Sequence, residues 1–339
     1  MKALKIFEPK ILKIVDIEEP KIVDKNDVKI KTMTTGICGS DVSMYAGTNT
    51  MVVYPRIFGH EMAGEVVEVG SSVENLKVGD HVTVDPVNNC GYCHACREGR
   101  PNICYNLKVR GVQGEGFNAE YIVVPKDAVY KLSSSIPWEE ACLIEPYTIG
   151  FNATSRAGLK PADTLLILGA GTIGQTTLRT ALMMGARVII SDIDDEKLET
   201  AKNQGAFLTI NPARDDLKKI IEENTEGFGP NVVIDAVCIP ETVEQSIELA
   251  APGGRVVTLG FSETPSKIQQ KHITAKELDI RGSRLNNRKF ASVIKSLEDK
   301  KINFDDMISH VIDFKDAKDA FEIMLDANTP KKKIVLKYY

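Results

Sequence analysis

The spacing of apolar residues changes along the chain, and its first part has the pattern of strands. Up to about residue 130, short runs rich in β-branched residues are broken by Gly, Asp, Asn and Pro. Such runs are typical of short strands joined by turns. The runs that predict strands are 28–38, 65–70, 81–85 and 119–124. We therefore expect the first part of the chain to be rich in β-structure.

Between residues 164 and 281 the pattern becomes one in which strands alternate with helices. Apolar runs predict strands at 164–168, 187–191, 231–235, 255–259 and 278–282. Segments that predict helices separate them at 172–185, 194–205, 216–227 and 241–254. This alternation indicates βαβ units and a parallel sheet. Two amphipathic segments, 288–300 and 315–327, and a last strand within 331–339 follow.

Composition places the chain among ordinary globular proteins. Its 339 residues are enough for about two domains. The net charge of -5 argues against a nucleic-acid-binding domain, which would be basic. No apolar run is long enough to span a membrane, and the N-terminus lacks the apolar segment of a signal peptide. We therefore expect a cytoplasmic protein with no membrane or nucleic-acid partner.

Four cysteines, Cys90, Cys93, Cys96 and Cys104, lie within one short polar stretch. Thiolates at this spacing can close a tetrahedral zinc site with no position left for water, as structural zinc sites do. A two-cluster ferredoxin pattern places its fourth cysteine sooner and follows it with proline. A disulfide framework is typical of short secreted chains, which this chain does not resemble. The stretch therefore predicts a structural zinc site.

A glycine-rich turn follows the predicted strand 164–168 and opens the next helix, with the sequence Gly169-Ala-Gly171-Thr172-Ile173-Gly174. The first glycine allows a tight turn, the second lets the backbone approach a pyrophosphate, and the third packs helix against strand. The N-terminus of the helix offers unpaired N–H groups to that anion. An ordinary strand-to-helix turn is the alternative, but the strand and helix on either side favour a dinucleotide site.

Asp192 ends the second strand of this region, where an acidic residue can accept a hydrogen bond from a ribose 2′-hydroxyl. Because its negative charge would repel a 2′-phosphate, we predict NAD rather than NADP. Lys197 lies one helical turn later and could reach the ribose or a phosphate. A solvated surface lysine is an equally good interpretation of Lys197.

Cys38, His60, Glu61 and Glu145 are candidate metal ligands that lie far apart in the sequence. Each has an ordinary structural interpretation by itself. A single cysteine is often buried in a core, a single histidine is often structural, and a glutamate before proline could anchor a loop. Composition alone does not assemble them into one site.

Together these motifs resemble the zinc-dependent medium-chain dehydrogenases, the group of alcohol, sorbitol and threonine dehydrogenases. GICGSD, GHEMAGEVVEVG, the four-cysteine stretch, Glu145-Pro146 and GAGTIG occur in the order and at the spacing of that family over essentially the whole length. The resemblance implies a Rossmann domain, a doubly wound parallel sheet, inserted into a GroES-like β-rich catalytic domain. The implied parts are 1–150 for the catalytic domain, 151–284 for the NAD-binding domain, and 285–339 for a segment that returns to the catalytic domain.

The resemblance also implies two zinc ions per subunit, one structural and one catalytic. Cys38, His60 and a carboxylate from Glu61 or Glu145 would hold the catalytic zinc, and the pattern matches the sorbitol-type branch. Which glutamate binds directly, and whether one acts through water, stays open. Ser40 would begin a proton relay, with a turn-forming serine as the alternative. The family's usual relay histidine is absent, and Ser43 stands in its place.

The resemblance points to a polyol or a sugar acid as substrate. Ser283 and Arg284 match a segment that sorbitol-type relatives place beside the cofactor and the substrate, and a guanidinium binds a carboxylate well. A contact with the cofactor, or a structural contact, is the alternative for Arg284. Tyr45 is a second candidate for the substrate pocket, with a core tyrosine as the alternative. Several stretches, including SRLNNRKF, resemble bacterial starvation-sensing and L-galactonate-type sugar-acid dehydrogenases.

Three other functions remain for comparison. A threonine-type amino-alcohol dehydrogenase shares every metal and nucleotide motif. A zinc-free quinone reductase lacks the cysteine stretch and the Cys38, His60 and Glu61 set. A zinc ribbon that binds nucleic acid or protein, or a sensor without catalysis on the same fold, is the non-enzyme alternative, and the acidic charge balance argues against nucleic acid. The family also implies a homo-oligomer, a dimer or a tetramer.

Overall fold

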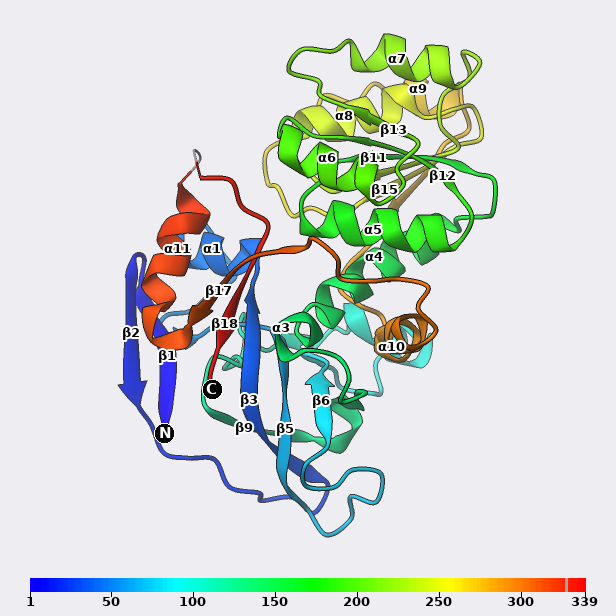
Figure 1. Cartoon of the computed structure of the whole chain (residues 1–339). Helices are drawn as coiled ribbons and strands as arrows, with labels where there is room; N and C mark the ends of the chain where they lie inside the picture. The colour runs from blue at the N-terminus through cyan, green and yellow to red at the C-terminus, as the bar shows by residue number, and fades with distance from the viewer. Residues whose placement is uncertain (327–328) are drawn as a thin grey trace. The chain divides into compact units, whose positions relative to one another are not determined.

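A computed structural model describes residues 1–326 and 329–339 (Figure 1). The chain divides into two compact units. Unit 1 comprises Met1–Glu145, Phe290–Glu298 and Phe304–Tyr339, and unit 2 comprises Pro146–Lys289 and Asp299–Asn303. The boundaries expected from the sequence, at 150 and 284, stay predictions. No helix among the described residues is long and apolar enough to cross a membrane.

Unit 1 is built on a seven-stranded sheet with β3 (Asp27–Ile37) near its centre. The strand order is β10-β6-β5-β3-β18-β17, and β9 also pairs with β3. The predicted strands at 28–38, 65–70, 81–85, 119–124 and the C-terminus are confirmed. The other bounds are β5 Glu61–Val69, β6 His81–Val84, β9 Tyr121–Pro125, β10 Val129–Lys131, β17 Ile308–Asp313 and β18 Lys333–Lys337.

The ends of three strands in this sheet meet at one place. Gly36, near the end of β3, pairs with Glu61 at the start of β5 and with Val335 in β18. A Cβ atom at Gly36 would lie 2.1 Å from a carboxylate oxygen of Glu61, so any larger residue here would displace that carboxylate. The sheet therefore brings Glu61 against β3 and beside the start of β18.

Smaller elements complete unit 1. A three-stranded sheet, β2-β1-β4, was not expected from the sequence, and neither was the helix α1. The segment 288–300 forms α10, and 315–327 forms α11, with residue 327 outside the described part of the chain. The bounds are β1 Lys2–Glu8, β2 Ile11–Asp16, β4 Arg56–Ile57, β7 Val87–Asn88, β8 Lys108–Val109, α1 Gly39–Ala46, α2 His94–Arg97, α3 Trp138–Ala141, α10 Phe290–Glu298 and α11 Ala317–Leu325.

Unit 2 contains a six-stranded, fully parallel sheet, as the alternation of strands and helices predicts. Its order, β13-β12-β11-β14-β15-β16, is that of a dinucleotide-binding sheet. The second and third strands are added outward on one side of β11, and the next three are added on its other side. The bounds are β11 Thr164–Leu168, β12 Arg187–Ser191, β13 Leu208–Ile210, β14 Val232–Asp235, β15 Arg255–Thr258 and β16 Asp279–Gly282.

Helices cover both faces of this sheet. Alternate residues of β11 explain the two layers, because Leu165 and Ile167 join a core with Leu178 of α5, while Leu166 joins a second core with Ile221 of α7. Strands that are buried on both faces have continuous runs of apolar residues in the sequence. These strands could therefore be predicted from the sequence. The helices are α4 Ile144–Ala157, α5 Thr172–Met183, α6 Asp195–Asn203, α7 Leu217–Asn224, α8 Pro240–Leu249 and α9 Gln270–Thr274.

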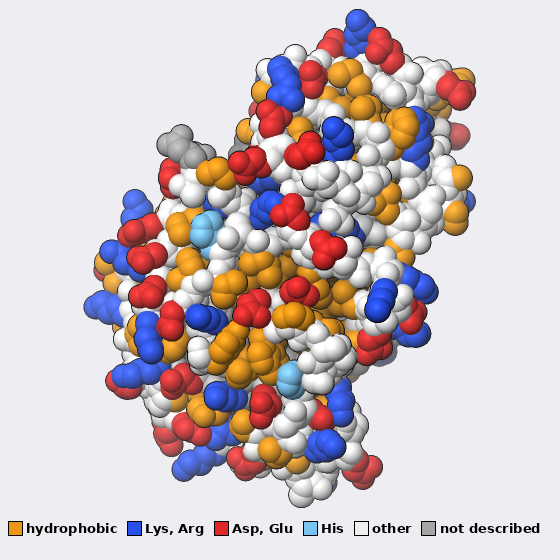
Figure 2. Space-filling view, in the orientation of Figure 1, with side chains coloured by type: hydrophobic (Ala, Val, Ile, Leu, Met, Phe, Trp, Pro, Cys, Tyr) orange, Lys and Arg blue, Asp and Glu red, His pale blue; other side chains and the backbone are white. Residues whose placement is uncertain are grey.

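On the face that Figure 2 draws, acidic and basic side chains are interspersed, in keeping with a chain that carries 42 Lys and Arg and 47 Asp and Glu. No strongly basic stripe is visible on that face.

Candidate metal centres and nucleotide site

Cys38, His60 and Glu61 come together in unit 1. Their donor atoms all lie within 4.8 Å of one another. Cys38 caps the N-terminus of α1 directly after β3, and His60 immediately precedes β5, whose first residue is Glu61. A thiolate, an imidazole and a carboxylate are the ligand types of catalytic zinc sites. The residues present therefore fit a zinc ion.

Glu145 lies in the first turn of α4, and its side chain is buried. Burial raises the pKa of its carboxyl group to about 8, with a further increase from the negative charge of Glu61 and an opposing effect from His60. Glu145 is not one of the three residues whose donor atoms lie within 4.8 Å of one another. The charges of His60 and Glu61 nevertheless act on the pKa of its carboxyl group.

Lys333 binds Glu61 in a fully buried ion pair that sequence analysis missed. Its Nζ atom lies 2.8 Å from both carboxylate oxygens of Glu61 and donates to the carbonyl oxygen of Ile37 at 3.1 Å. Burial lowers the pKa of Lys333, but the charges of Glu61 and Cys38 outweigh this and raise it above its usual range. The ammonium group therefore stays charged and neutralises the negative charge of Glu61.

Asp41 is a second residue that sequence analysis did not assign, although it belongs to the GICGSD motif. Its buried carboxylate accepts hydrogen bonds from the backbone N–H groups of Cys38 at 3.0 Å and Gly59 at 3.2 Å. Its Oδ1 atom also lies 3.7 Å from Nδ1 of His60. Asp41 thus ties together the two turns that carry Cys38 and His60, as carboxylates beside metal-binding histidines commonly do.

The electrostatics of His60 follow from these neighbours. Burial lowers the pKa of its imidazole, but the negative charges of Asp41, Cys38 and Glu145 have the larger combined effect and raise it well above the usual value. An anionic pocket of this kind attracts a cation. A divalent metal ion would take the place of the protons that the cluster otherwise holds.

Ser40, Ser43 and Tyr45 all lie on α1. The hydroxyl of Ser43 donates to the carbonyl oxygen of Ser40 at 2.9 Å, and the side chain of Ser40 is half-buried. The ring of Tyr45 is buried and stacks on Phe321 with 4.6 Å between centroids. The ring contact of Tyr45 is one that a core tyrosine makes. The relay through Ser40 and the place of Tyr45 in the substrate pocket stay predictions.

The four cysteines of the polar stretch form a separate cluster, again with all sulfur atoms within 4.8 Å. Sulfur–sulfur distances are 3.5 Å for Cys93–Cys96, 3.8 Å for Cys93–Cys104 and 3.4 Å for Cys90–Cys104. Four thiolates about 2.3 Å from a central zinc ion lie roughly 3.8 Å apart, whereas a disulfide needs about 2.0 Å. The geometry therefore fits a tetrahedral zinc site.

Backbone N–H groups also point at these sulfurs. The N–H of Cys90 lies 3.3 Å from the sulfur of Cys104, and the N–H of Asn106 lies at the same distance from it. Hydrogen bonds from Tyr105 and Cys96 lower the pKa of Cys93 to about 6. A thiolate at neutral pH is the form that binds metal.

In unit 2 the glycine-rich turn has the expected geometry. Gly169 has φ of 94°, which favours glycine, and a Cβ atom at Gly174 would lie 1.9 Å from the carbonyl oxygen of Gly169. Gly171 caps α5, so Thr172 and Ile173 form its first turn. The backbone at the N-terminus of α5 is thus arranged as a phosphate-binding helix end requires.

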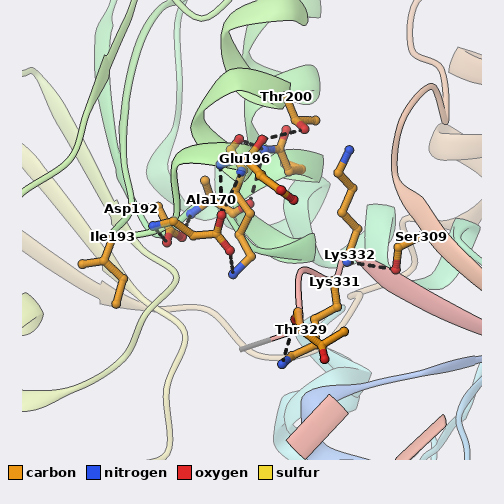
Figure 3. A network of polar contacts seen from close by, with 12 residues as sticks. Ala170, Asp192, Ile193, Glu196, Thr200, Ser309, Thr329, Lys331 and Lys332 are labelled. Atoms are coloured by element: carbon orange, nitrogen blue, oxygen red, sulfur yellow. Dashed lines mark hydrogen bonds and ion pairs between the residues drawn. The ribbon is translucent and has the colours of Figure 1, made fainter. Parts of the chain in front are cut away.

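Asp192 supports this turn directly. One carboxylate oxygen accepts from the N–H of Ala170 at 2.7 Å, and the other accepts from the N–H of Asp194 at 3.0 Å (Figure 3). Lys197 forms an ion pair with Asp194 at 3.1 Å. Asp192 therefore shapes the turn as well as supplying the negative charge that the sequence analysis assigned to it.

Ser283 and Arg284 follow β16, at the carboxyl edge of the same sheet. Ser283 is buried, and its N–H donates to the carbonyl oxygen of Thr258 at 3.0 Å. The guanidinium of Arg284 lies over the ring of Phe261, 5.0 Å from its centroid. Ligands of open parallel sheets bind at this edge.

Comparison with known proteins agrees with this geometry. The alcohol dehydrogenase GroES-like domain matches residues 24–134, and the zinc-binding dehydrogenase domain matches residues 172–299. L-threonine 3-dehydrogenase from Pyrococcus abyssi is 37% identical over 96% of this chain and 95% of its own length. Sorbitol dehydrogenase from Bacillus subtilis is 35% identical over 83% and 81%.

Among solved structures, an alcohol dehydrogenase named RspB from Escherichia coli CFT073, in complex with NADH, superimposes with a TM-score of 0.94. It is 39% identical, and the match covers 100% of this chain and 99% of that one. These matches confirm the expected pairing of a GroES-like fold with a Rossmann-type nucleotide-binding fold.

Proposed function

The chain belongs to the zinc-dependent medium-chain alcohol dehydrogenases, and from that membership we propose that it interconverts a secondary alcohol and a ketone on a polyol or sugar acid, using NAD. The observation that carries the proposal is the cluster of Cys38, His60 and Glu61 with Glu145 beside it. Their donors suit a catalytic zinc ion, and the dinucleotide-type sheet supplies a place for the hydride acceptor.

In this proposal Cys38, His60 and Glu145 hold the zinc, and Glu61 is held by Lys333 beside them. When bound, the zinc supplies Lewis-acid stabilisation of the charge that develops on the substrate oxygen. Asp41 keeps the Cys38 and His60 turns in place through its hydrogen bonds to their backbone. Ser40 is the first group to receive the alcohol proton. Because Ser43 stands where the usual relay histidine would be, the proton then leaves through the cofactor ribose, Ser43 or water.

The proposal assigns the pyrophosphate of NAD to the N–H groups that open α5. Asp192 would accept from the adenosine ribose while it holds Ala170, and its charge disfavours a 2′-phosphate. The RspB structure with NADH supports the choice of cofactor. For hydride transfer, the protein has to hold the substrate carbon against the nicotinamide ring and to exclude water from the site.

Arg284 supports an acidic or polyhydroxylated substrate, since its guanidinium can donate two parallel hydrogen bonds to a carboxylate. The relationship to sorbitol dehydrogenase supports a polyol or its acid. The second candidate is an L-threonine-type amino alcohol, which the Pyrococcus relative favours. Threonine also carries a carboxylate, so Arg284 does not separate the two.

Formation of NADH by zinc-loaded protein on polyols, hexonates and L-threonine tests the proposal. We expect turnover of a polyol or hexonate, with Glu145→Ala reducing kcat/KM by about a thousandfold, because a metal ligand is lost. Glu140→Gln, in the neighbouring helix α3, is the matched control and should retain activity. Turnover of L-threonine alone would move the assignment to the amino-alcohol branch.

We also propose a cytoplasmic homo-oligomer, a dimer or tetramer, in which 1–150 with 285–339 act as the catalytic domain and 151–284 as the NAD-binding domain. β16 supports assembly, because it is the last strand of the unit 2 sheet and its Ile280 is 42% exposed. Sedimentation equilibrium would test this, and a monomer at micromolar concentration would contradict it.

A further inference from the structure

The segment that joins β16 to α10 has a strained backbone. Leu285, Asn287 and Arg288 have φ values of 51°, 41° and 61°, in the left-handed region that non-glycine residues rarely adopt. Residues in this conformation are strained and persist only where the surrounding structure fixes them. The same segment carries Arg284. A specific interaction must therefore hold it.

Asn152 of α4 provides that interaction. Its side chain is 1% exposed, and its Nδ2 atom lies 2.8 Å from the carbonyl oxygen of Leu285, 3.1 Å from that of Arg284 and 3.3 Å from the hydroxyl of Ser283. Three acceptors on consecutive residues thus converge on one buried amide. A buried amide group without hydrogen-bond partners costs free energy. The contacts of Asn152 therefore fix the backbone from which the Arg284 side chain extends.

The side chain of Arg284 is fixed from the other end. Its guanidinium lies over Phe261, which follows β15 at the same carboxyl edge of the sheet and is 61% exposed. An arginine held by its backbone on one side and by a ring on the other loses little further freedom when it binds a ligand. Another contact between α4 and this segment, Lys289 Nζ to Ser155 Oγ at 3.2 Å, is exposed.

We infer that Asn152 is a positioning residue, which acts through Arg284 to set the affinity for a carboxylate-bearing substrate. The inference rests on the proposed function, because it takes Arg284 as the group that contacts the substrate. In this view the hydrogen bonds of Asn152 hold the strained backbone of 285–288 in place. The side chain of Arg284 is thereby kept at the carboxyl edge of the parallel sheet, where ligands bind.

A double-mutant cycle between Asn152 and Arg284 tests this inference. Asn152→Leu removes the donors and keeps the branched side-chain shape with the same number of heavy atoms, and Arg284→Met removes the guanidinium. We expect each to raise the KM for a hexonate by about tenfold, as loss of a hydrogen bond to a charged group does, with little change in kcat or in NADH affinity. The double variant should be no worse than Arg284→Met alone.

A purely structural role for Asn152 gives a different result. In that case Asn152→Leu would lower Tm, NADH affinity and kcat together, and its effect on KM would add to that of Arg284→Met. Asn152→His, which retains a donor, should recover part of the hexonate KM, and Lys289→Met, which removes an exposed tie, should leave it unchanged. Additive effects on KM would overturn the inference.

Hydrogen exchange separates failure of the inference from failure of the proposed function. Asn152→Leu should speed amide exchange in residues 283–289 and leave the turn at 169–174 unchanged, whatever the substrate is. If the wild-type protein turns over no hexonate, the proposed substrate class is wrong, and the inferred substrate role of Asn152 falls with it. If it does turn over hexonate but exchange at 283–289 is unaltered in the variant, only the inference fails.

Discussion

Lys333, the first residue of β18, places its ammonium nitrogen 2.8 Å from both carboxylate oxygens of Glu61, the first residue of β5. Their side chains are only 3% and 2% exposed. A buried ion pair adds little stability by itself, but removal of one partner leaves an uncompensated charge in the protein interior. Lys333 therefore determines how much negative charge Glu61 contributes beside the metal ligands.

Replacement of Lys333 by methionine should destabilise the protein by about 3–5 kcal/mol, because Glu61 then remains buried without its counter-ion. The double variant Lys333→Met/Glu61→Gln should recover most of this loss. Lys332→Met is the matched control, since Lys332 pairs with the exposed Asp306 at 2.6 Å and should cost less than about 1 kcal/mol. Denaturant unfolding of zinc-loaded protein measures all three. Equal losses of unfolding free energy in Lys332→Met and Lys333→Met would contradict a buried ion pair between Lys333 and Glu61.

Loss of one sulfur from the four-cysteine cluster should remove one zinc ion and leave the other. Cys93→Ser is expected to reduce the zinc content from two ions to one per chain and to lower Tm, because zinc binding at such sites contributes of order 10 kcal/mol. Cys238→Ser changes a cysteine outside both clusters and should retain both ions. Metal analysis after gel filtration distinguishes the two variants. Two zinc ions in Cys93→Ser would exclude the cluster as a metal site.

Asp192 should affect both cofactor choice and turn geometry. Asp192→Ser removes the charge that opposes a 2′-phosphate, so the ratio of kcat/KM for NAD⁺ to that for NADP⁺ should fall by at least about tenfold. Asp192→Asn retains an acceptor for the N–H of Ala170 and should preserve stability better than serine does. Steady-state kinetics with both cofactors, together with Tm, tests this. An unchanged cofactor ratio in both variants would show that Asp192 acts only on the turn.

Asp80 should make stability depend on acid pH. Although burial raises the pKa of its carboxyl group, hydrogen bonds from Lys131 at 2.7 Å and from the N–H of Lys77 at 3.1 Å lower it overall. A group with a lowered pKa in the folded state stabilises the protein above its unfolded pKa, near 4, and loses this contribution as pH falls through the folded value. Asp80→Asn should therefore cost about 1 kcal/mol at pH 7 and much less at pH 3. Unfolding curves at the two pH values test it, and a penalty that is the same at both would show that the charge is irrelevant.

Features that depend on residues close in sequence were predictable from the sequence. The six-stranded parallel sheet followed from apolar runs, although the short strand β13 was missed because three residues carry little pattern. The cysteine cluster and the glycine turn followed from spacing, because all their members lie within one short segment. The role of Cys38, His60, Glu61 and Glu145 came from resemblance to a family, since no local pattern joins them.

The tertiary structure alone decided which distant residues meet. Lys333 was one of three consecutive lysines, and only the pairing of β18 with β3 buries it and turns it toward Glu61, 272 positions away. Asn152 lies in α4, a helix that the sequence did not predict, and no motif includes it. The residues that it contacts lie more than 130 positions further along the chain. Hydrophobic period and motif spacing encode local geometry, whereas the burial that gives a lysine or an asparagine its partner arises only when the chain has packed.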